Sequence, residues 1–238
     1  MTSGADNTHE VERLDRRRLA LSVLAISLFL ALFLFLPAGT LAWMNGWRFL
    51  LVFLGTGTLA GLYLWRVNRA IFVARSRMMH EGTKSWDRML LRFLIPAIVA
   101  IPPVAALDAR RFHWCPVPWC VCALGYFLLL LGMGITAWAQ AVNKFFEPSV
   151  RIQTERGHRV IDAGPYAIVR HPGYVAGCLL TVGTALSLGS LWALIPASLA
   201  ALLLLVRTRW EDQTLQGELL GYRDYAQRVR FKWIPGLW

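Results

Sequence analysis

The chain carries long apolar runs separated by short polar connections. Six runs are long and apolar enough to cross a membrane as helices: Leu19–Leu36, Trp47–Trp65, Met89–Leu107, Trp114–Val142, Pro172–Leu188 and Leu191–Val206. A hydrocarbon core about 30 Å thick takes about 20 residues of helix, and backbone groups in lipid must bond within their own segment. The pattern therefore predicts an all-α, polytopic integral membrane helix bundle of about six transmembrane helices.

Prolines and one tight turn shape these runs. Pro96 interrupts the third run, and Pro116 and Pro118 blur the start of the fourth. Gly189-Ser190 is too short a connection for anything but a hairpin between the last two runs. We expect three regions: an N-terminal cytoplasmic tail (1–18), transmembrane helices one to four (19–142), and a core (143–238) that holds the polar loop, the last two spans and a C-terminal helix.

That C-terminal helix is short and amphipathic. One face of the segment 221–235 carries Tyr222, Tyr225, Ala226 and Val229, and Pro235 stops the helix. Two interpretations stay open at this point: an anchor that lies in the membrane interface, or a lid over a pocket.

Composition and charge agree with a membrane protein. Apolar residues make up 56% of the 238 residues and charged residues 16%, which excludes an ordinary soluble enzyme and a disordered chain. Of the 25 lysines and arginines, all but Arg48, Arg110 and Arg111 fall on one side of the six-span arrangement. The positive-inside rule then places both termini in the cytoplasm. The net charge of +11 is explained by orientation and lipid headgroups rather than by nucleic acid.

The cysteines offer no metal site. Cys115, Cys120 and Cys122 cluster near the outer end of the fourth run, with a spacing that matches no zinc site. A disulfide between Cys115 and Cys120 and a role as small apolar filler are both open. We expect no metal.

Candidate chemistry gathers where the fifth run begins. The polar stretch 143–174 ends in Arg170-His171-Pro172-Gly173-Tyr174, and proline is favoured in the first turn of a helix. A helix that begins at Pro172 would leave the N–H groups of Gly173 and Tyr174 free to donate hydrogen bonds to a carboxylate or phosphate. The alternative is structural: His171 caps the helix while Arg170 reaches the lipid headgroups.

A second cluster closes the last run. Arg207 and Glu211 are four residues apart and could form an intrahelical ion pair. However, Glu211 and Asp212 near a helix C-terminus oppose the helix dipole, which favours a cationic partner for them and leaves Arg207 for an anionic group. A pocket built from both clusters would take an amphoteric ligand, such as S-adenosylmethionine or another zwitterion.

These motifs resemble a known family. Gly164-Pro165-Tyr166, the Arg170–Tyr174 element, Arg207-x-x-x-Glu211-Asp212 and Gly221-x-x-x-Tyr225 are similar to the isoprenylcysteine carboxyl methyltransferase family, and phospholipid N-methyltransferases share parts of the pattern. The resemblance covers residue 143 to the C-terminus. The second acidic residue, Asp212, departs from the glutamate of that family.

The resemblance implies an S-adenosylmethionine-dependent methyltransferase at the cytoplasmic face, with S-adenosylhomocysteine as product. The acceptor is implied to be hydrophobic or lipid-borne and to enter from the bilayer. The implied cofactor contacts are Gln153, His158, Arg159, Val160, Ile161, Gly164, Tyr166, His171, Pro172, Gly173, Tyr174 and Glu211. Arg207 is implied to contact the acceptor, and Arg207 and Glu211 are the candidate catalytic residues.

Alternatives remain for the function. A phospholipid amine or a small thiol could replace a prenylcysteine carboxylate as acceptor on the same scaffold. A nicotinamide-dependent membrane reductase is disfavoured because the chain has no G-x-G-x-x-G motif. A transporter or non-enzymatic scaffold is disfavoured because the two halves show no matching segments. We expect no nucleic acid and no obligate protein partner.

Overall fold

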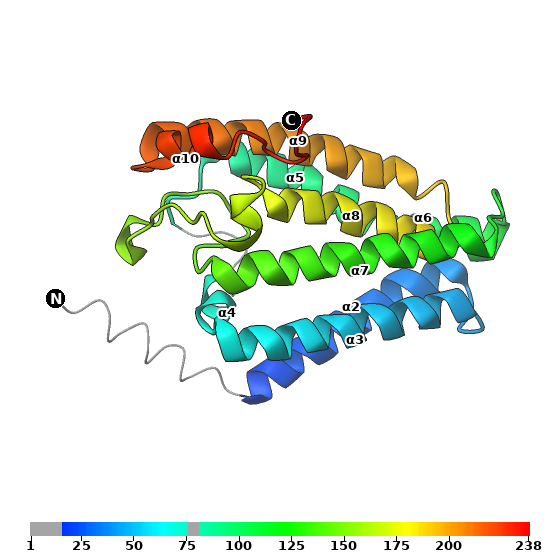
Figure 1. The fold of residues 1–238 in the computed structure, drawn as a ribbon. Coiled ribbons are helices and arrows are strands. Elements are labelled where there is room, and N and C mark those ends of the chain that lie inside the picture. Colours follow the sequence, from blue (N-terminus) through cyan, green and yellow to red (C-terminus); the bar gives the residue numbers. More distant parts are fainter. Residues whose placement is uncertain (1–15, 76–80) are drawn as a thin grey trace.

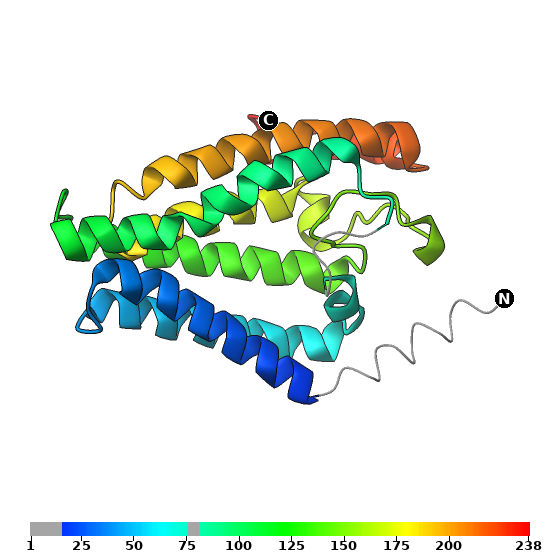
Figure 2. The ribbon, with the colours of Figure 1, turned by 180° about the vertical axis from the view of Figure 1, so that it is seen from behind.

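The computed structural model describes residues 16–75 and 81–238, and that part of the chain is a bundle of helices without strands. The helices run side by side, with α2 and α3 along one flank and α9 along the other (Figures 1 and 2). They are α2 (Arg16–Ala38), α3 (Met44–Val67), α4 (Ala70–Ala74), α5 (Ser85–Val99), α6 (Ile101–Ala106), the π-helical η1 (Leu107–Phe112), α7 (Trp119–Val142), the 3-10 turns η2 (Thr154–Arg156) and η3 (Gly164–Ala167), α8 (Pro172–Ser187), α9 (Leu194–Glu218) and α10 (Tyr222–Arg228). The predicted all-α fold is confirmed. Most of the predicted N-terminal tail, residues 1–15, lies outside the described residues.

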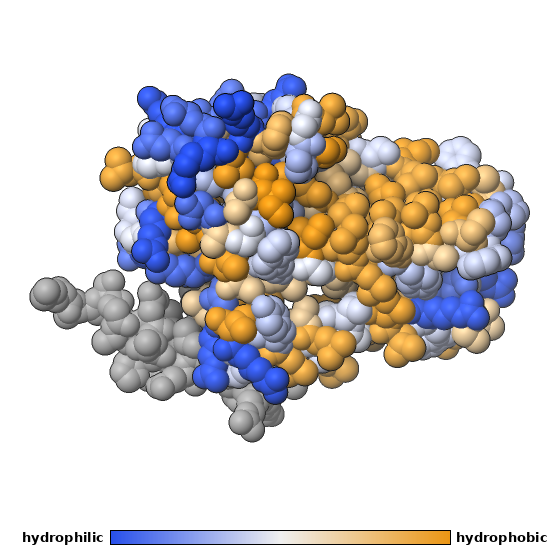
Figure 3. Space-filling model, viewed as in Figure 1, coloured by the Kyte–Doolittle hydropathy of each residue, from blue (hydrophilic) through white to orange (hydrophobic). Residues whose placement is uncertain are grey.

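Three helical segments in the described part are long and apolar enough to cross a membrane: Met44–Val67, Ser85–Phe112 and Trp119–Val142. Leu24–Ala38 and Pro172–Ser187 are shorter apolar helices. The sixth predicted span forms the apolar first half of α9, whose second half carries the charged cluster. Apolar residues cover the middle of the molecule (Figure 3), and many large ones, such as Leu51 and Phe127, are exposed. The protein is an integral membrane protein.

Proline positions explain where two helices differ from the expectation. The helix of the third span continues through Pro96 and breaks at Ala100, because Pro102 and Pro103 lie in the first turn of α6, where a missing N–H costs nothing. The fourth span begins at Trp119 rather than at Trp114, because Pro116 and Pro118 hold the preceding residues in extended backbone.

Helices α7 and α8 approach each other closely. A Cβ added at Gly125 of α7 would lie 2.1 Å from the backbone nitrogen of Ser187 in α8, and one at Gly183 would lie 2.6 Å from the backbone nitrogen of Leu129. Glycine at these positions therefore brings the two backbones into contact, which fixes the direction in which α8 leaves the polar loop.

The two ends of the bundle differ. The end that carries α4, residues 143–171 and α10 is called the cavity end. The opposite end, with η1, residues 113–118 and the connection from α8 to α9, is called the far end. At the far end, the buried carboxylate of Asp108 accepts hydrogen bonds from the Ser190 hydroxyl at 2.6 Å and from the backbone nitrogens of Cys115 and Trp192 at 3.0 and 3.3 Å. All four cysteines are free.

The predicted C-terminal helix is α10, but it ends at Arg228 and not at Pro235, because Val229 already leaves the helical conformation. Its residues Tyr222 and Tyr225 are buried, and they pack with Leu219 against Ile152 and Val160 of the polar loop. Because this apolar face contacts the protein, α10 forms part of the wall at the cavity end.

Candidate active site

A cavity of about 610 Å³ opens at the cavity end, a size typical of small-molecule sites. Its wall is formed by α5, α8, α9 and α10, by Arg75 after α4, and by the loop that follows α7. Twelve of the thirteen predicted site residues line it: Gln153, His158, Arg159, Val160, Ile161, Tyr166, His171, Pro172, Gly173, Tyr174, Arg207 and Glu211. Segments far apart in the sequence thus meet at one site.

Gly164 does not line the cavity. It begins η3 with φ of +59°, a conformation that favours glycine. A Cβ there would lie 3.0 Å from Nε1 of Trp138 in α7. Gly164 therefore contributes by turning the loop close against α7, and not by direct contact with a ligand in the cavity.

The start of α8 follows the prediction in part. The helix begins at Pro172, and no described group accepts a hydrogen bond from the Gly173 N–H. The Tyr174 N–H, which we expected to be free, donates to the His171 carbonyl at 3.1 Å. A Cβ at Gly173 would lie 2.7 Å from the Phe146 ring, so glycine lets this ring cover the first turn.

Asp212 is the centre of a buried polar network. Arg170 donates to both of its carboxylate oxygens, at 2.9 and 3.1 Å, and His171 Nε2 lies 3.2 Å from Oδ1. The hydroxyl of Tyr222 and the amide of Gln216 donate to the same carboxylate, at 3.0 and 2.8 Å. Asp212 therefore fastens the start of α8 to α9 and α10, which gives this position a structural role.

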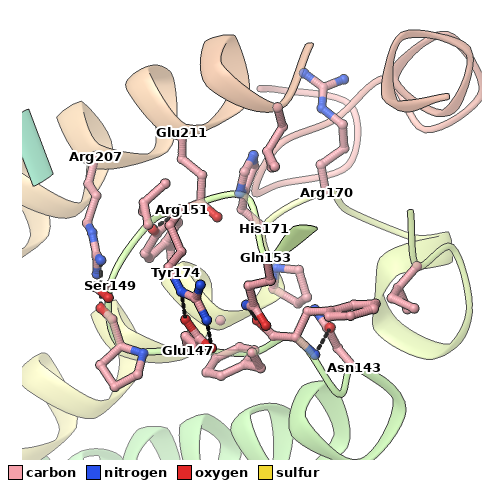
Figure 4. A pocket seen from close by; sticks show the side chains of 18 of the residues that line it. Asn143, Glu147, Ser149, Arg151, Gln153, Arg170, His171, Tyr174, Arg207 and Glu211 are labelled. Carbon is pink, nitrogen blue, oxygen red and sulfur yellow. Dashed lines mark hydrogen bonds and ion pairs between the residues drawn. The ribbon is translucent and has the colours of Figure 1, made fainter. Parts of the chain in front are cut away.

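Arg170 also joins the C-terminal segment to the site. Its Nη1 donates to the carbonyls of Ala226, Val229 and Arg230 at the end of α10. Its side chain points away from the cavity centre toward α10 (Figure 4). The structural alternative in which Arg170 reaches lipid headgroups is wrong, because its guanidinium is buried and paired with Asp212.

Arg207 has a partner that the sequence did not suggest. Its Nε and Nη2 bond to the two oxygens of Asp87, at 2.7 and 3.0 Å, and Nη2 also donates to the Pro148 carbonyl at 2.7 Å. The sequence had suggested that Arg207 either pairs with Glu211 or is free to bind an anion. In the structure it does not pair with Glu211, and Asp87 and Pro148 already use part of its guanidinium. Asp87 is fully buried in the first turn of α5, and it also accepts from the Val150 N–H at 2.7 Å.

In contrast to Asp87 and Arg207, Glu211 has few hydrogen-bond partners in the described part of the protein. Its carboxylate extends from α9 into the cavity (Figure 4), and its described hydrogen bond is from the Tyr174 hydroxyl to Oε2. No described cation forms an ion pair with it. Four oxygen lone pairs of a carboxylate thus meet one protein donor, which leaves capacity for a cationic or N–H-bearing ligand.

The loop after α7 is stiffened by its own charges. The Glu147 carboxylate is bound by Arg151, at 2.8 and 3.0 Å, and by Arg156 at 3.3 Å. Gln153 donates to the Phe145 carbonyl at 2.7 Å and accepts from Arg156 at 2.6 Å. Gln153 therefore uses its side-chain oxygen and one N–H to hold the loop. Its second N–H can donate a hydrogen bond to a ligand.

His158 is held in its neutral form. Its Nδ1 accepts a hydrogen bond from the backbone N–H of Gln153 at 3.3 Å, and its ring lies 4.6 Å from that of Phe145. Burial lowers the pKa of His158 to about 4, with the nearby Glu147 charge acting in the opposite direction. A neutral ring beside Phe145 offers a flat surface for an aromatic ligand.

Two tyrosines close the remaining side of the cavity. The Tyr166 hydroxyl accepts from Asn143 Nδ2 at 3.0 Å, and the Tyr225 hydroxyl donates to the Tyr166 carbonyl at 2.7 Å. Burial raises the pKa of Tyr166, so the phenol stays neutral. In the described part of the chain, no group of three or more His, Cys, Asp or Glu side chains is placed to hold a metal ion.

Sequence reasoning missed Asp87, Glu147 and Arg151. Asp87 carried a weak signal, an acidic residue in the first turn of an apolar helix. Its pairing with Arg207 joins positions 120 residues apart, which no local pattern shows.

Comparison with known proteins supports the predicted resemblance. Residues 120–219 match the phospholipid methyltransferase family. The protein-S-isoprenylcysteine O-methyltransferase B of Arabidopsis thaliana is 27% identical over 148 residues, which cover 58% of this chain and 70% of that protein. The chain is thus similar to membrane methyltransferases of the isoprenylcysteine and phospholipid methyltransferase type. The family match begins at residue 120 and therefore does not include Asp87.

Proposed function

We propose that the protein is an S-adenosylmethionine-dependent methyltransferase that methylates a hydrophobic acceptor in this cavity, at the cytoplasmic face of the membrane. The observation that carries the proposal is the Glu211 carboxylate, which faces the cavity beside the start of α8 and has a single described hydrogen-bond donor.

The residues present fit S-adenosylmethionine. Its ammonium and sulfonium groups are cationic, and Glu211 supplies the uncompensated negative charge. Its carboxylate suits the positive end of α8, where the Gly173 N–H has no described acceptor. Its adenine suits the flat, neutral surface of Phe145, His158 and Tyr166. When bound, it supplies an electrophilic methyl group.

The acceptor side of the cavity is apolar. Leu91, Leu94, Ile95 and Ile98 of α5 and Leu204 of α9 line it. These residues belong to helices of the membrane bundle, so a lipid-like body would lie along them while its reactive end meets the polar residues. This agrees with the isoprenylcysteine substrate that the name of the Arabidopsis relative indicates.

The chemistry demands little beyond alignment and exclusion of water. A bond forms between the acceptor atom and the methyl carbon while the carbon–sulfur bond breaks and its electron pair stays on sulfur. A carboxylate acceptor transfers no proton. An amine acceptor would have to lose one, and Glu211 is placed to accept it. The match to the phospholipid methyltransferase family makes such an amine the second candidate acceptor.

The orientation rests on charge. Arg69, Arg75 and Lys144 lie on connections at the cavity end, and Arg66 lies in the last turn of α3 at the same end, while Arg48, Arg110 and Arg111 belong to the far end. The positive-inside rule then puts the cavity end, with both chain termini, in the cytoplasm.

Calorimetric titration of S-adenosylmethionine into purified protein tests the proposal. The matched control for Glu211→Gln is Glu218→Gln, because Glu218 lies two turns further along α9 and pairs with Lys84 at the surface. We expect wild type and Glu218→Gln to bind alike and Glu211→Gln to bind at least about tenfold more weakly, since a hydrogen bond to a charged group contributes about 1.5–3 kcal/mol. Absence of binding to folded wild type would contradict the proposal.

A further inference from the structure

The residues that follow α10 form a strap along α9. We call residues 229–238 the C-terminal strap; they turn back from the end of α10 and run beside α9 toward the middle of the bundle (Figures 1 and 2). The strap contains bends and turns but no helix or strand. The backbone oxygen of Trp238 accepts hydrogen bonds from the N–H groups of Lys232, Trp233 and Ile234, at 2.9, 2.9 and 3.1 Å. These bonds close the strap into a compact loop.

The strap is bonded to the two residues that precede α8. The backbone N–H groups of Arg170 and His171 donate to the carbonyls of Phe231 and Lys232, at 2.9 and 3.0 Å. Arg170 and His171 are buried and line the cavity. Because α8 begins at the next residue, Pro172, these two hydrogen bonds fix the backbone where the helix starts.

Trp233 anchors the strap to α9. Its indole Nε1 donates a hydrogen bond to the Thr208 hydroxyl at 2.9 Å. Thr208 is completely buried, and its hydroxyl donates in turn to the Leu204 carbonyl at 2.7 Å. The hydroxyl hydrogen is thus used within α9, and the oxygen lone pairs are available to the indole. Loss of this hydroxyl would leave the indole N–H without its described acceptor.

Trp233 does not line the cavity, but residues that pack with it do. Its ring packs against a buried apolar cluster of α5 and α9, as does Tyr174 of α8. Leu91, Leu94 and Leu204 of this cluster line the cavity, and so does Tyr174. Trp233 therefore lies behind the apolar wall, while the strap that it anchors holds the residues before α8.

We propose that Trp233, through its hydrogen bond to Thr208, is a positioning residue that fixes the start of α8 and thereby sets the affinity of the cavity for the methyl donor. This inference rests on the proposed function and deepens it, because it makes donor affinity depend on a residue outside the cavity. The alternative is that Trp233 only anchors the protein in the membrane interface, as tryptophans often do. In that case its loss would lower stability and leave donor affinity unchanged.

Titration of S-adenosylhomocysteine into purified Thr208→Val tests this role, because valine keeps the volume of threonine but cannot accept the indole N–H. We expect binding to weaken about two- to tenfold, the effect of losing one hydrogen bond. Thr208→Ser keeps a hydroxyl and should restore most of the wild-type affinity. Adding Thr208→Val to Trp233→Phe should weaken binding no further than Trp233→Phe alone, because both changes remove the same hydrogen bond.

Thr56→Val and Trp47→Phe are the matched controls. The Thr56 hydroxyl in α3 also donates to the carbonyl four residues earlier, at 2.6 Å, and the Trp47 indole donates to the Leu41 carbonyl at 2.8 Å. Neither residue lines the cavity. Both variants should bind S-adenosylhomocysteine as wild type does. A lower melting temperature with unchanged affinity in Thr208→Val would overturn the proposal, because it would show a purely structural role.

Hydrogen exchange of the ligand-free protein separates this proposal from the proposed function. The backbone amides of Arg170 and His171 should exchange faster in Thr208→Val than in wild type, and at the wild-type rate in Thr56→Val. If wild type does not bind S-adenosylhomocysteine, the proposed function fails, and exchange alone decides the role of the strap. Faster exchange would then support the positioning of α8 by Trp233, and unchanged exchange would overturn it.

Discussion

Two buried carboxylates at opposite ends of the bundle have very different surroundings. At the far end, Asp108 accepts hydrogen bonds from a hydroxyl and two backbone N–H groups and is completely buried. At the cavity end, Glu211 faces a cavity with the Tyr174 hydroxyl as its described donor. A carboxylate whose acceptor capacity is filled by the protein holds the fold together. A carboxylate left largely unfilled at a cavity wall is available to a ligand.

The same criterion divides the cavity end itself. Asp87 and Asp212 lie within the site, yet each is bound by an arginine and by further donors. We therefore assign them to the scaffold. Glu211 lines the cavity without an ion-pair partner among the described residues, and we assign it to a ligand.

The largest expected effect comes from Asp212→Ala. Removal of this carboxylate leaves Arg170 buried without its partner, and breaking a buried ion pair in this way costs about 3–5 kcal/mol. We expect a marked fall in the melting temperature in detergent. Glu218→Ala is the control, because its ion pair with Lys84 is half exposed and contributes at most about 1 kcal/mol. Equal melting temperatures for the two variants would show that Asp212 is not a scaffold residue.

A smaller effect on stability is expected at the contact between α7 and α8. Gly125→Ala places a Cβ 2.1 Å from the Ser187 backbone nitrogen, so the helices must move apart, at a cost of about 1–3 kcal/mol. Gly134→Ala, on the same helix, meets nothing within 4 Å and should be neutral or slightly stabilising. Thermal unfolding of both variants measures the difference. If Gly134→Ala lowers the melting temperature more than Gly125→Ala does, the close contact between α7 and α8 at Gly125 is not what stabilises this part of the bundle.

The smallest expected effect is a pH dependence of donor binding through His158. Its pKa is about 4 in the folded loop and about 6.5 in an unfolded one, so below pH 6.5 the unfolded loop binds more protons. The folded loop thus loses stability as pH falls from about 6.5 toward 4 and is insensitive to His158 above that range. The dissociation constant of S-adenosylhomocysteine should rise over this window.

His158→Asn supplies the control for this pH dependence. The variant keeps a polar side chain near the Gln153 N–H but cannot take up a proton. Its dissociation constant should vary less between pH 7 and pH 5 than that of wild type. An identical rise in both proteins would assign the pH dependence to other groups.

Local patterns predicted much of the fold and the outline of the site. Apolar runs located the helices, and Pro172 marked the start of α8 at the right residue. The face formed by Tyr222 and Tyr225 predicted a helix there, but not the surface against which it packs. The motifs selected residues that line one cavity, because they lie at the start of α8, in the second half of α9 and in α10, all at the cavity end of the bundle.

Pairing between distant segments could not be read from the sequence. The local spacing of Arg207 and Glu211 favoured a relation between these two residues, but Asp87 on α5 supplies the partner of Arg207. Similarly, Asp212 could be seen as an acidic residue but not as the acceptor for Arg170. Whether the protein satisfies the hydrogen-bonding capacity of Glu211 or of Asp212 depends on the tertiary packing of α5, α8 and α10 around α9.

Thermal unfolding of wild type, Glu211→Gln and Asp108→Asn, each with and without S-adenosylhomocysteine, tests the central claim most directly. A ligand at about 100 times its dissociation constant stabilises the protein by about 2.7 kcal/mol, so one series reports both stability and binding. We expect Glu211→Gln to melt near the wild-type temperature and to lose most of the ligand-induced shift. Asp108→Asn should melt at a lower temperature and keep the shift. The reverse pattern, with Glu211→Gln destabilised but still stabilised by the ligand, would contradict the account.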